Sequence, residues 1–168
     1  WCKATNFELD TRVPLFIRTP WIPQKGVVTD ALVELVDLYP TLTDLTGIKP
    51  PDNLDGQSFL HVLNDPSASG RNAVLSQFNR PWESTTPEVM GYSIRTSSKR
   101  YTRWIDWQTR KVLSEELYDY SSKISSREFF GNRFEQENIA KNQPEELQTM
   151  SEHMDNMFTR RLGGTVRP

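Results

Sequence analysis

The fold of this chain is decided by the stretch MGYSIRTSSKRYTRWIDW, residues 90–107. Residues 90–96 and 101–107 are rich in aromatic and β-branched side chains, which favour strands. The four polar residues between them suit a hairpin connection. Two more short strands are predicted, at 73–78 and 116–120. Four short strands joined locally predict an antiparallel sheet, which needs a second layer on one face.

The tail of the chain predicts one amphipathic helix. Pro144 suits the first position of a helix, and the two glutamates after it suit the positive end of the helix dipole. Gly163 and Gly164 are expected to end the helix. Its apolar stripe is rich in methionine, which indicates adaptable packing rather than a cofactor site. The stripe consists of Leu147, Met150, Met154, Met157, Phe158 and Leu162.

The part of the chain before the predicted sheet has a different pattern. Residues 13–18 form a short apolar run before Thr19-Pro20 and predict a buried strand. Leucines at three- and four-residue spacing predict a helix from about Asp37 to Thr46, with Gly47 placed to stop it. A start near Asp37 leaves Pro40 in the first turn, where proline is tolerated. A short turn of helix is expected after residues 56–60.

Composition excludes several classes of function. The 20 basic and 22 acidic residues give a net charge of −2, which argues against a nucleic-acid partner. No apolar run approaches the roughly 20 residues that span a bilayer, so no membrane partner is expected. The single cysteine, Cys2, excludes an internal disulfide and a cysteine-based metal cluster.

A search for a self-sufficient catalytic site among these residues fails. His61 and His153 lie far apart in the sequence, and neither belongs to a metal-ligand motif, so no metal ligand is predicted. Arg95 and Arg100 flank the hairpin and are expected to be sheet-surface or buried ion-pair residues rather than substrate ligands. Lys3, taken alone, is expected to be a solvated charge on a polar loop.

Several motifs resemble those of the sulfatases, in particular the iduronate-2-sulfatase group. Residues 1–7, WCKATNF, are similar to the W-x-K-x-x-N-F loop of that family. Further similar elements occur in family order along nearly the whole chain. They are LVDLYPTL (35–42), LDGQS (54–58), SQFNRP (76–81), MGYSIRT with RYTRW (90–104), ELYD (116–119), and ENIA with PE (137–145).

The resemblance implies a fold class and a place in a larger protein. The fold would be α/β and alkaline-phosphatase-like. Residues 1–66 would be the last strand and helix elements of the large sulfatase domain, and residues 67–168 a C-terminal subdomain with a four-stranded antiparallel sheet and a helix. The chain would then be the C-terminal piece of a secreted, periplasmic or lysosomal enzyme.

The resemblance also implies an activity, cofactors and site residues. The full enzyme would hydrolyse a sulfuric ester, removing 2-O-sulfate from uronate residues of a sulfated polysaccharide. Its formylglycine nucleophile and calcium would lie on sequence outside this chain. Lys3 would contact the sulfate and act in catalysis, and Asn79 and Arg80 would bind substrate. Arg80 could pair with the uronate carboxylate, because a guanidinium matches a carboxylate with two hydrogen bonds.

Two other functions remain open on the sequence. One is a phosphonate or phosphodiester hydrolase of the same superfamily, which the nucleophile and metal ligands upstream would distinguish from a sulfatase. The other is a non-catalytic binding module made of the C-terminal subdomain alone. The predicted strand at residues 13–18 argues against the module, because an unpaired buried-type strand is an aggregation hazard.

Overall fold

The structure is a computed structural model that describes residues 4–22, 25–121 and 135–161. The chain divides into two compact units. One consists of Trp1–Val13 together with Leu75–Pro168, and the other of Pro14–Val74. The division at residue 66, which the family resemblance implies for the whole protein, stays a prediction.

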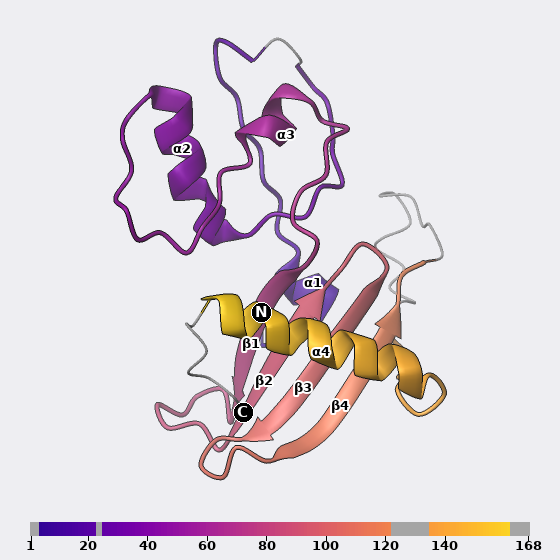
Figure 1. The fold of residues 1–168 in the computed structure, drawn as a ribbon. Coiled ribbons are helices and arrows are strands. Elements are labelled where there is room, and N and C mark those ends of the chain that lie inside the picture. Colours follow the sequence, from indigo (N-terminus) through magenta and orange to yellow (C-terminus); the bar gives the residue numbers. More distant parts are fainter. Residues whose placement is uncertain (1–3, 23–24, 122–134, 162–168) are drawn as a thin grey trace. The chain divides into compact units, whose positions relative to one another are not determined.

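The first unit is built on a four-stranded sheet in the order β1-β2-β3-β4 (Figure 1). Strand β2 pairs antiparallel with β3, and β3 pairs antiparallel with β4. The hairpin predicted from residues 90–107 is therefore confirmed, together with the four-stranded sheet around it. The strands are β1 (Val74–Arg80), β2 (Val89–Arg95), β3 (Lys99–Asp106) and β4 (Val112–Asp119).

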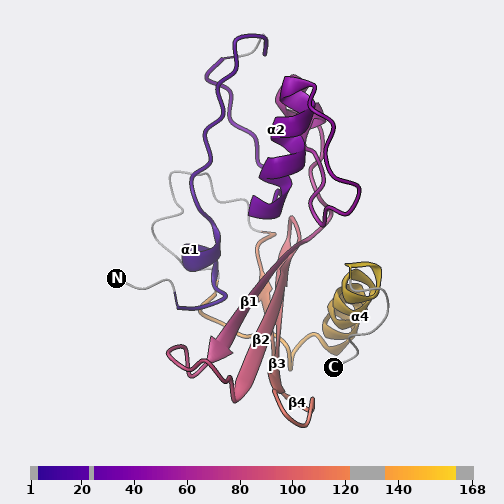
Figure 2. The same cartoon turned by 90° about the vertical axis from the view of Figure 1, so that its left-hand side faces the viewer.

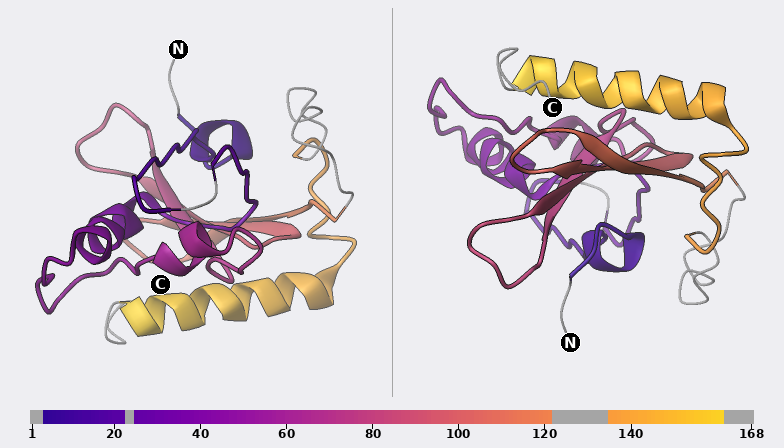
Figure 3. Two further views of the ribbon diagram at one scale, coloured as in Figure 1. Left: turned by 90° about the horizontal axis from the view of Figure 1, so that it is seen from above. Right: turned by 90° about the horizontal axis from the view of Figure 1, so that it is seen from below.

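Helix α4 (Pro144–Arg161) covers one face of this sheet, as Figure 3 shows from above and below. The helix buries Met150, Met154 and Phe158 against Ile94, Tyr101 and Leu117 of the strands. The methionine-rich stripe is thus confirmed as packing, and it forms the hydrophobic core of the unit. The predicted end of the helix, at Leu162, Gly163 and Gly164, lies outside the described residues.

The opposite face of the sheet is polar and is covered by residues 4–11 (Figures 2 and 3). The short helix α1 (Glu8–Thr11) lies on the side away from α4 (Figures 2 and 3). Ser93, Arg100 and Thr102 point to this side and are each at most 1% exposed. The sheet therefore has an apolar core on one face and a buried polar layer on the other.

The second unit contains a 3₁₀ turn, Leu35–Asp37, followed by α2 (Leu38–Thr46) and α3 (Leu60–Asn64). The predicted helix start near Asp37 is confirmed, and it leaves Pro40 in the first turn of α2. Gly47 ends the helix with a φ of 68°, a left-handed conformation that favours glycine. None of the described helices is both long and apolar enough to cross a membrane.

Asp37 joins two of the family-like motifs in this unit. Its carboxylate accepts hydrogen bonds from the backbone N–H of Gln57 at 2.8 Å and of Glu34 at 2.9 Å. The guanidinium of Arg71 also binds it, with Nε donating at 2.7 Å. Burial alone would raise the pKa of Asp37, but these hydrogen bonds outweigh burial and lower the pKa below its ordinary value of 3.8.

The turn that carries Gln57 needs its glycine. A Cβ on Gly56 would lie 2.1 Å from the carbonyl oxygen of Val36, a distance that no side chain tolerates. Thr41 completes the junction, since its hydroxyl accepts a hydrogen bond from the N–H of Phe59 at 3.0 Å. The motifs LVDLYPTL and LDGQS therefore hold each other in place.

The strand predicted for residues 13–18 is wrong. This segment has no regular secondary structure, and the side chain of Phe16 is 92% exposed. A strand requires a neighbouring backbone to pair with, and none of the described residues pairs with this segment. Pro14 also removes one of its backbone donors.

Candidate functional site

Two of the three predicted site residues lie at the end of β1, close to the start of the chain. Lys3 itself lies outside the described residues. The guanidinium of Arg80 donates a hydrogen bond from Nη1 to the carbonyl oxygen of Ala4 at 2.8 Å. Because Ala4 directly follows Lys3 in the sequence, the structure brings Arg80 to the loop that carries the predicted sulfate contact.

Aromatic rings hold the Arg80 side chain in position. Its guanidinium carbon lies 4.9 Å from the ring centre of Phe78 and 5.7 Å from that of Trp104. Trp104 is itself fixed by a hydrogen bond from Nε1 to the carboxylate of Glu116 at 2.8 Å. Cation–π contacts of this kind orient a guanidinium without neutralising its charge.

Asn79 supports the loop that follows β1. Its amide nitrogen donates to the carbonyl oxygen of Pro81 at 3.0 Å and to that of Ser84 at 3.3 Å. The peptide bond between Arg80 and Pro81 is cis. The described contacts of Asn79 therefore shape the turn beside Arg80.

The segment after Lys3 is attached to the polar face of the sheet by buried side chains. Asn6 is 4% exposed and donates from Nδ2 to the carbonyl oxygen of Gly91 at 3.0 Å. Glu8 is 7% exposed, and its carboxylate binds Arg95 at 3.2 Å and Arg100 at 2.6 Å. Phe7 packs its ring edge-on against Tyr118.

Arg100 is the centre of this polar layer. Its side chain is 1% exposed and lies between the carboxylates of Glu8 and Glu135, with Nε 2.7 Å from Glu135 Oε1. It also donates to the hydroxyl groups of Ser93 and Thr11, at 3.2 and 3.1 Å. Glu135 in turn accepts hydrogen bonds from the N–H of Glu8 at 2.9 and 3.1 Å.

Electrostatic interactions in this layer keep Arg100 charged and Tyr120 neutral. Burial alone would lower the pKa of Arg100, but Tyr120, Glu135 and Glu8 outweigh burial and raise it. Burial raises the pKa of Tyr120, and its hydrogen bond to Glu135 raises it further. Arg100 therefore stays a cation, and the Tyr120 hydroxyl stays protonated and donates to Glu135.

The structure confirms that Arg95 and Arg100 are ion-pair residues. Sequence reasoning missed Glu8, which binds both arginines, and Asn6, which binds the carbonyl oxygen of Gly91 on β2. One signal could have revealed Glu8. In the predicted hairpin Arg95 and Arg100 are directly opposite each other, as the register confirms. Like charges in opposite positions repel, so a carboxylate was to be expected between them.

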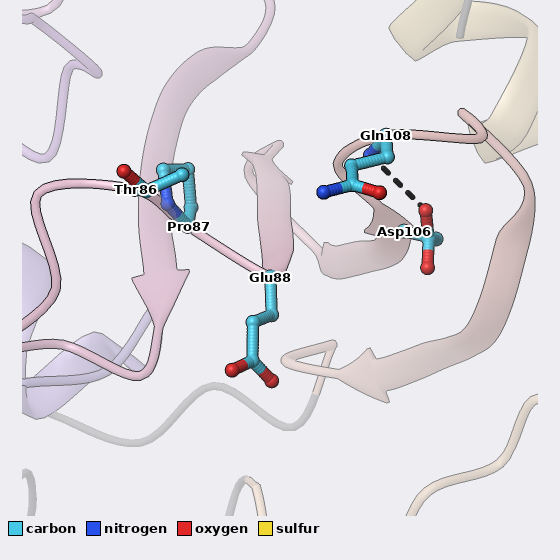
Figure 4. A pocket seen from close by; sticks show the side chains of 5 residues that line it. All are labelled: Thr86, Pro87, Glu88, Asp106 and Gln108. Carbon is cyan, nitrogen blue, oxygen red and sulfur yellow. Dashed lines mark hydrogen bonds between the residues drawn. The ribbon is translucent and has the colours of Figure 1, made fainter.

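A hollow of about 460 Å³ lies at the loops beside the start of β2 and the end of β3 (Figure 4), next to Arg80, whose carbonyl oxygen accepts a hydrogen bond from the N–H of Glu88 at 2.9 Å. Gln108 donates its backbone N–H to Asp106 there, at 3.1 Å. Hydrogen bonds from Thr109 lower the pKa of Asp106 below its ordinary value, which favours the ionised carboxylate. The negative charges of Asp106 and Glu88 make this hollow unsuitable for an anionic ester.

Within the described ranges, no three His, Cys, Asp or Glu side chains lie close enough together to hold a metal ion. The same ranges include both histidines, and Nε2 of His61 lies 3.0 Å from the carbonyl oxygen of Ser69.

Comparison with known proteins extends over almost the whole chain. Residues 1–153 match the family model described as the C-terminal region of N-sulphoglucosamine sulphohydrolase. Mouse iduronate 2-sulfatase is 32% identical over 68% of this chain and 30% of its own length. Mouse arylsulfatase K is 30% identical over 71% of this chain and 21% of its own length.

A solved structure of a 2-O GAG sulfatase shares the fold. It superposes with a TM-score of 0.53 at 27% identity, over 74% of this chain and 24% of that structure. The chain thus spans less than a third of the length of each of these relatives.

Proposed function

This chain belongs to the sulfatases, as their C-terminal region, and we propose that its full protein removes 2-O-sulfate from uronate residues of a sulfated polysaccharide. The observation that carries the proposal is the match to sulfatases along residues 1–153. The names of two relatives, an iduronate 2-sulfatase and a 2-O GAG sulfatase, support the position of the sulfate.

Lys3 is the residue of this chain that we assign to the reacting group. Cleavage of a sulfate ester leaves negative charge on the bridging oxygen, and a fixed cation beside that oxygen stabilises the transition state more than the ground state. An ammonium group supplies this charge and can donate hydrogen bonds to the sulfate oxygens. Lys3 would therefore bind the substrate and assist the departure of the alcohol.

Arg80, with Asn79 beside it, is our candidate for the sugar contact. Among the described residues, the hydrogen bond to Ala4 occupies only Nη1 of the Arg80 guanidinium. The other edge keeps donors that could pair with a uronate carboxylate. The contacts of Asn79 with Pro81 and Ser84 support a role in shaping the loop on which Arg80 would meet the sugar.

The nucleophile and metal of the full enzyme are assigned to residues outside this chain. Formylglycine would supply the attacking oxygen, and calcium would bind and polarise the sulfate. Among the described residues, no three His, Cys, Asp or Glu side chains form a cluster that could hold the metal. What this chain contributes is the cation that meets the leaving oxygen and the arginine that meets the sugar.

Exposed apolar side chains support the proposal that residues 1–66 are the last elements of the large sulfatase domain and pack against the rest of that domain. Large apolar side chains on a surface mark sites of protein contact. Several of them in the unit Pro14–Val74 are more than 60% exposed, and an isolated module would leave this apolar surface in water. They are Phe16, Trp21, Val28, Leu35 and Ile48. The argument against a binding module therefore rests on these side chains, and no longer on a strand at residues 13–18.

Sulfate release from defined disaccharides tests the proposal. The full protein should release sulfate from a disaccharide with a 2-O-sulfated uronate, and much less from one sulfated only at the 6-position of the hexosamine. Lys3→Ala should lower kcat/KM by about 10²- to 10³-fold, the usual loss for one oxyanion donor. Release from the 6-position alone would refute the assigned substrate, and cleavage of a phosphodiester alone would refute the reaction.

A further inference from the structure

We propose that Trp104 is a positioning residue for substrate recognition, because it keeps the carboxylate of Glu116 away from the guanidinium of Arg80. The inference rests on the proposed contact between Arg80 and the uronate carboxylate. Trp104 does not touch the substrate in this account. It preserves the free positive charge with which Arg80 binds the substrate.

Arg80 is a cation whose charge no carboxylate of the described residues compensates. Four other arginines form ion pairs with carboxylates, whereas none of the ion pairs among the described residues involves Arg80. The described partners of its guanidinium are the carbonyl oxygen of Ala4 and the rings of Phe78 and Trp104. A guanidinium held by such neutral groups keeps its full charge for an anionic ligand.

The indole of Trp104 separates Arg80 from the nearest carboxylate of the same sheet face. The strands follow the order β1-β2-β3-β4, with Arg80 on β1, Trp104 on β3 and Glu116 on β4. One edge of the indole covers Gly91 of β2, where a Cβ would lie 2.5 Å from Cζ3. The other edge points to β4, since Nε1 donates to Glu116 at 2.8 Å. The ring therefore extends from β2 towards β4, between the two charged groups.

Both oxygen atoms of the Glu116 carboxylate are engaged in this cluster. Trp104 Nε1 donates to Oε1, and the Tyr118 hydroxyl donates to Oε2 at 3.1 Å. Tyr118 stays a donor because burial and the charge of Glu116 raise the pKa of its hydroxyl. Loss of the indole would free Oε1 and let Glu116 pair with Arg80. That ion pair would compete with a uronate carboxylate for the same guanidinium.

Steady-state assays of the full protein, with a uronate 2-O-sulfate and a neutral aryl sulfate, test this role. Trp104→Leu should raise KM for the uronate ester by about 10-fold, the effect of losing one hydrogen bond to a charged group. Its kcat and the KM for the aryl sulfate should hardly change, because only binding of the carboxylate is affected.

Rescue by a second substitution is the decisive measurement. In the Trp104→Leu background, Glu116→Gln should recover most of the lost affinity for the uronate ester, because the competing charge is gone. Glu116→Gln alone should leave both KM values unchanged, since its amide oxygen still accepts the hydrogen bond from Nε1. Trp104→Phe removes the N–H donor and keeps a ring in place, and it replaces Trp104→Leu in the same cycle if that variant does not fold.

The matched control is Glu115→Gln in the Trp104→Leu background. Glu115 precedes Glu116 on β4 and serves the opposite face of the sheet, where the hydroxyl of the core residue Tyr101 donates to it. This substitution removes the same charge from the same strand and should not restore KM.

The outcomes separate this inference from the proposed function. An unchanged KM in Trp104→Leu, a failed rescue by Glu116→Gln, or an equal rescue by Glu115→Gln would overturn the role of Trp104 and leave the contact of Arg80 with the uronate standing. If Arg80→Ala raised KM equally for both esters, the contact of Arg80 would be refuted, and the role of Trp104 with it.

Discussion

We expect Gly91→Ala to overfill the contact between β2 and the Trp104 ring. A Cβ at residue 91 would lie 2.5 Å from Cζ3, 2.7 Å from Cε3 and 2.8 Å from Cη2 of that ring. Carbon atoms rest about 3.5 to 4.0 Å apart, so the ring would have to move by roughly 1 Å. Its hydrogen bond to Glu116 and its contact with Arg80 resist that movement. Overpacking of this kind costs about 1–3 kcal/mol in the free energy of unfolding.

Urea unfolding of four proteins measures this cost. They are the wild type, Gly91→Ala, Trp104→Leu and the double variant. Without the Trp104 ring, Gly91→Ala should be neutral or stabilising by about 0.5–1 kcal/mol, because alanine orders more easily than glycine in a strand. The same destabilisation in both backgrounds would refute the reasoning, since the cost could not then come from the ring.

Three further predictions follow from other contacts. Asp37→Asn breaks the buried ion pair with Arg71 and should lower the free energy of unfolding by about 3 kcal/mol. The folded pKa of Asp37 lies below 3.8, so the stabilisation by its ionised carboxylate is present above pH 3.8 and is lost as the pH falls through the folded pKa. Urea unfolding midpoints measured above and below pH 3.8 should show this loss of stability in the wild type and not in the variant. Met154→Ala should cost about 2–5 kcal/mol in thermal unfolding, because the side chain is fully buried, and the half-buried Met157→Ala should cost clearly less. Arg80→Ala should raise KM for a uronate 2-O-sulfate more than for a neutral aryl sulfate, and equal increases in steady-state assays would contradict its carboxylate contact.

Local patterns predicted the sheet unit well. The hairpin at residues 90–107 and the stripe of α4 have their own periodicities, and each finds its partners within the chain. The segment 13–18 failed for the opposite reason, because an apolar run becomes a strand only when another backbone pairs with it. Burial and pairing are properties of the whole structure, and the run alone does not contain them.

The candidate site was predictable in part. The family-like motifs pointed to Asn79 and Arg80, and the structure brings Arg80 to the residue after Lys3. Glu8 was missed because its role depends on a contact between residues more than 80 positions apart. The one sequence signal for Glu8 was the register of the predicted hairpin, which places Arg95 and Arg100 opposite each other.

The contacts of Ala4, Asn6 and Glu8 limit how this segment can be exchanged between related proteins. Loops between rigid elements usually tolerate insertions, because a longer loop costs little additional entropy. Here Ala4, Asn6 and Glu8 each meet a fixed partner within five residues of chain, so one inserted residue would move at least one of them off its partner. This loop can therefore exchange the side chains between its anchors but not its length. A chimaera with another sulfatase would have to carry residues 4–11 together with the hairpin 90–104.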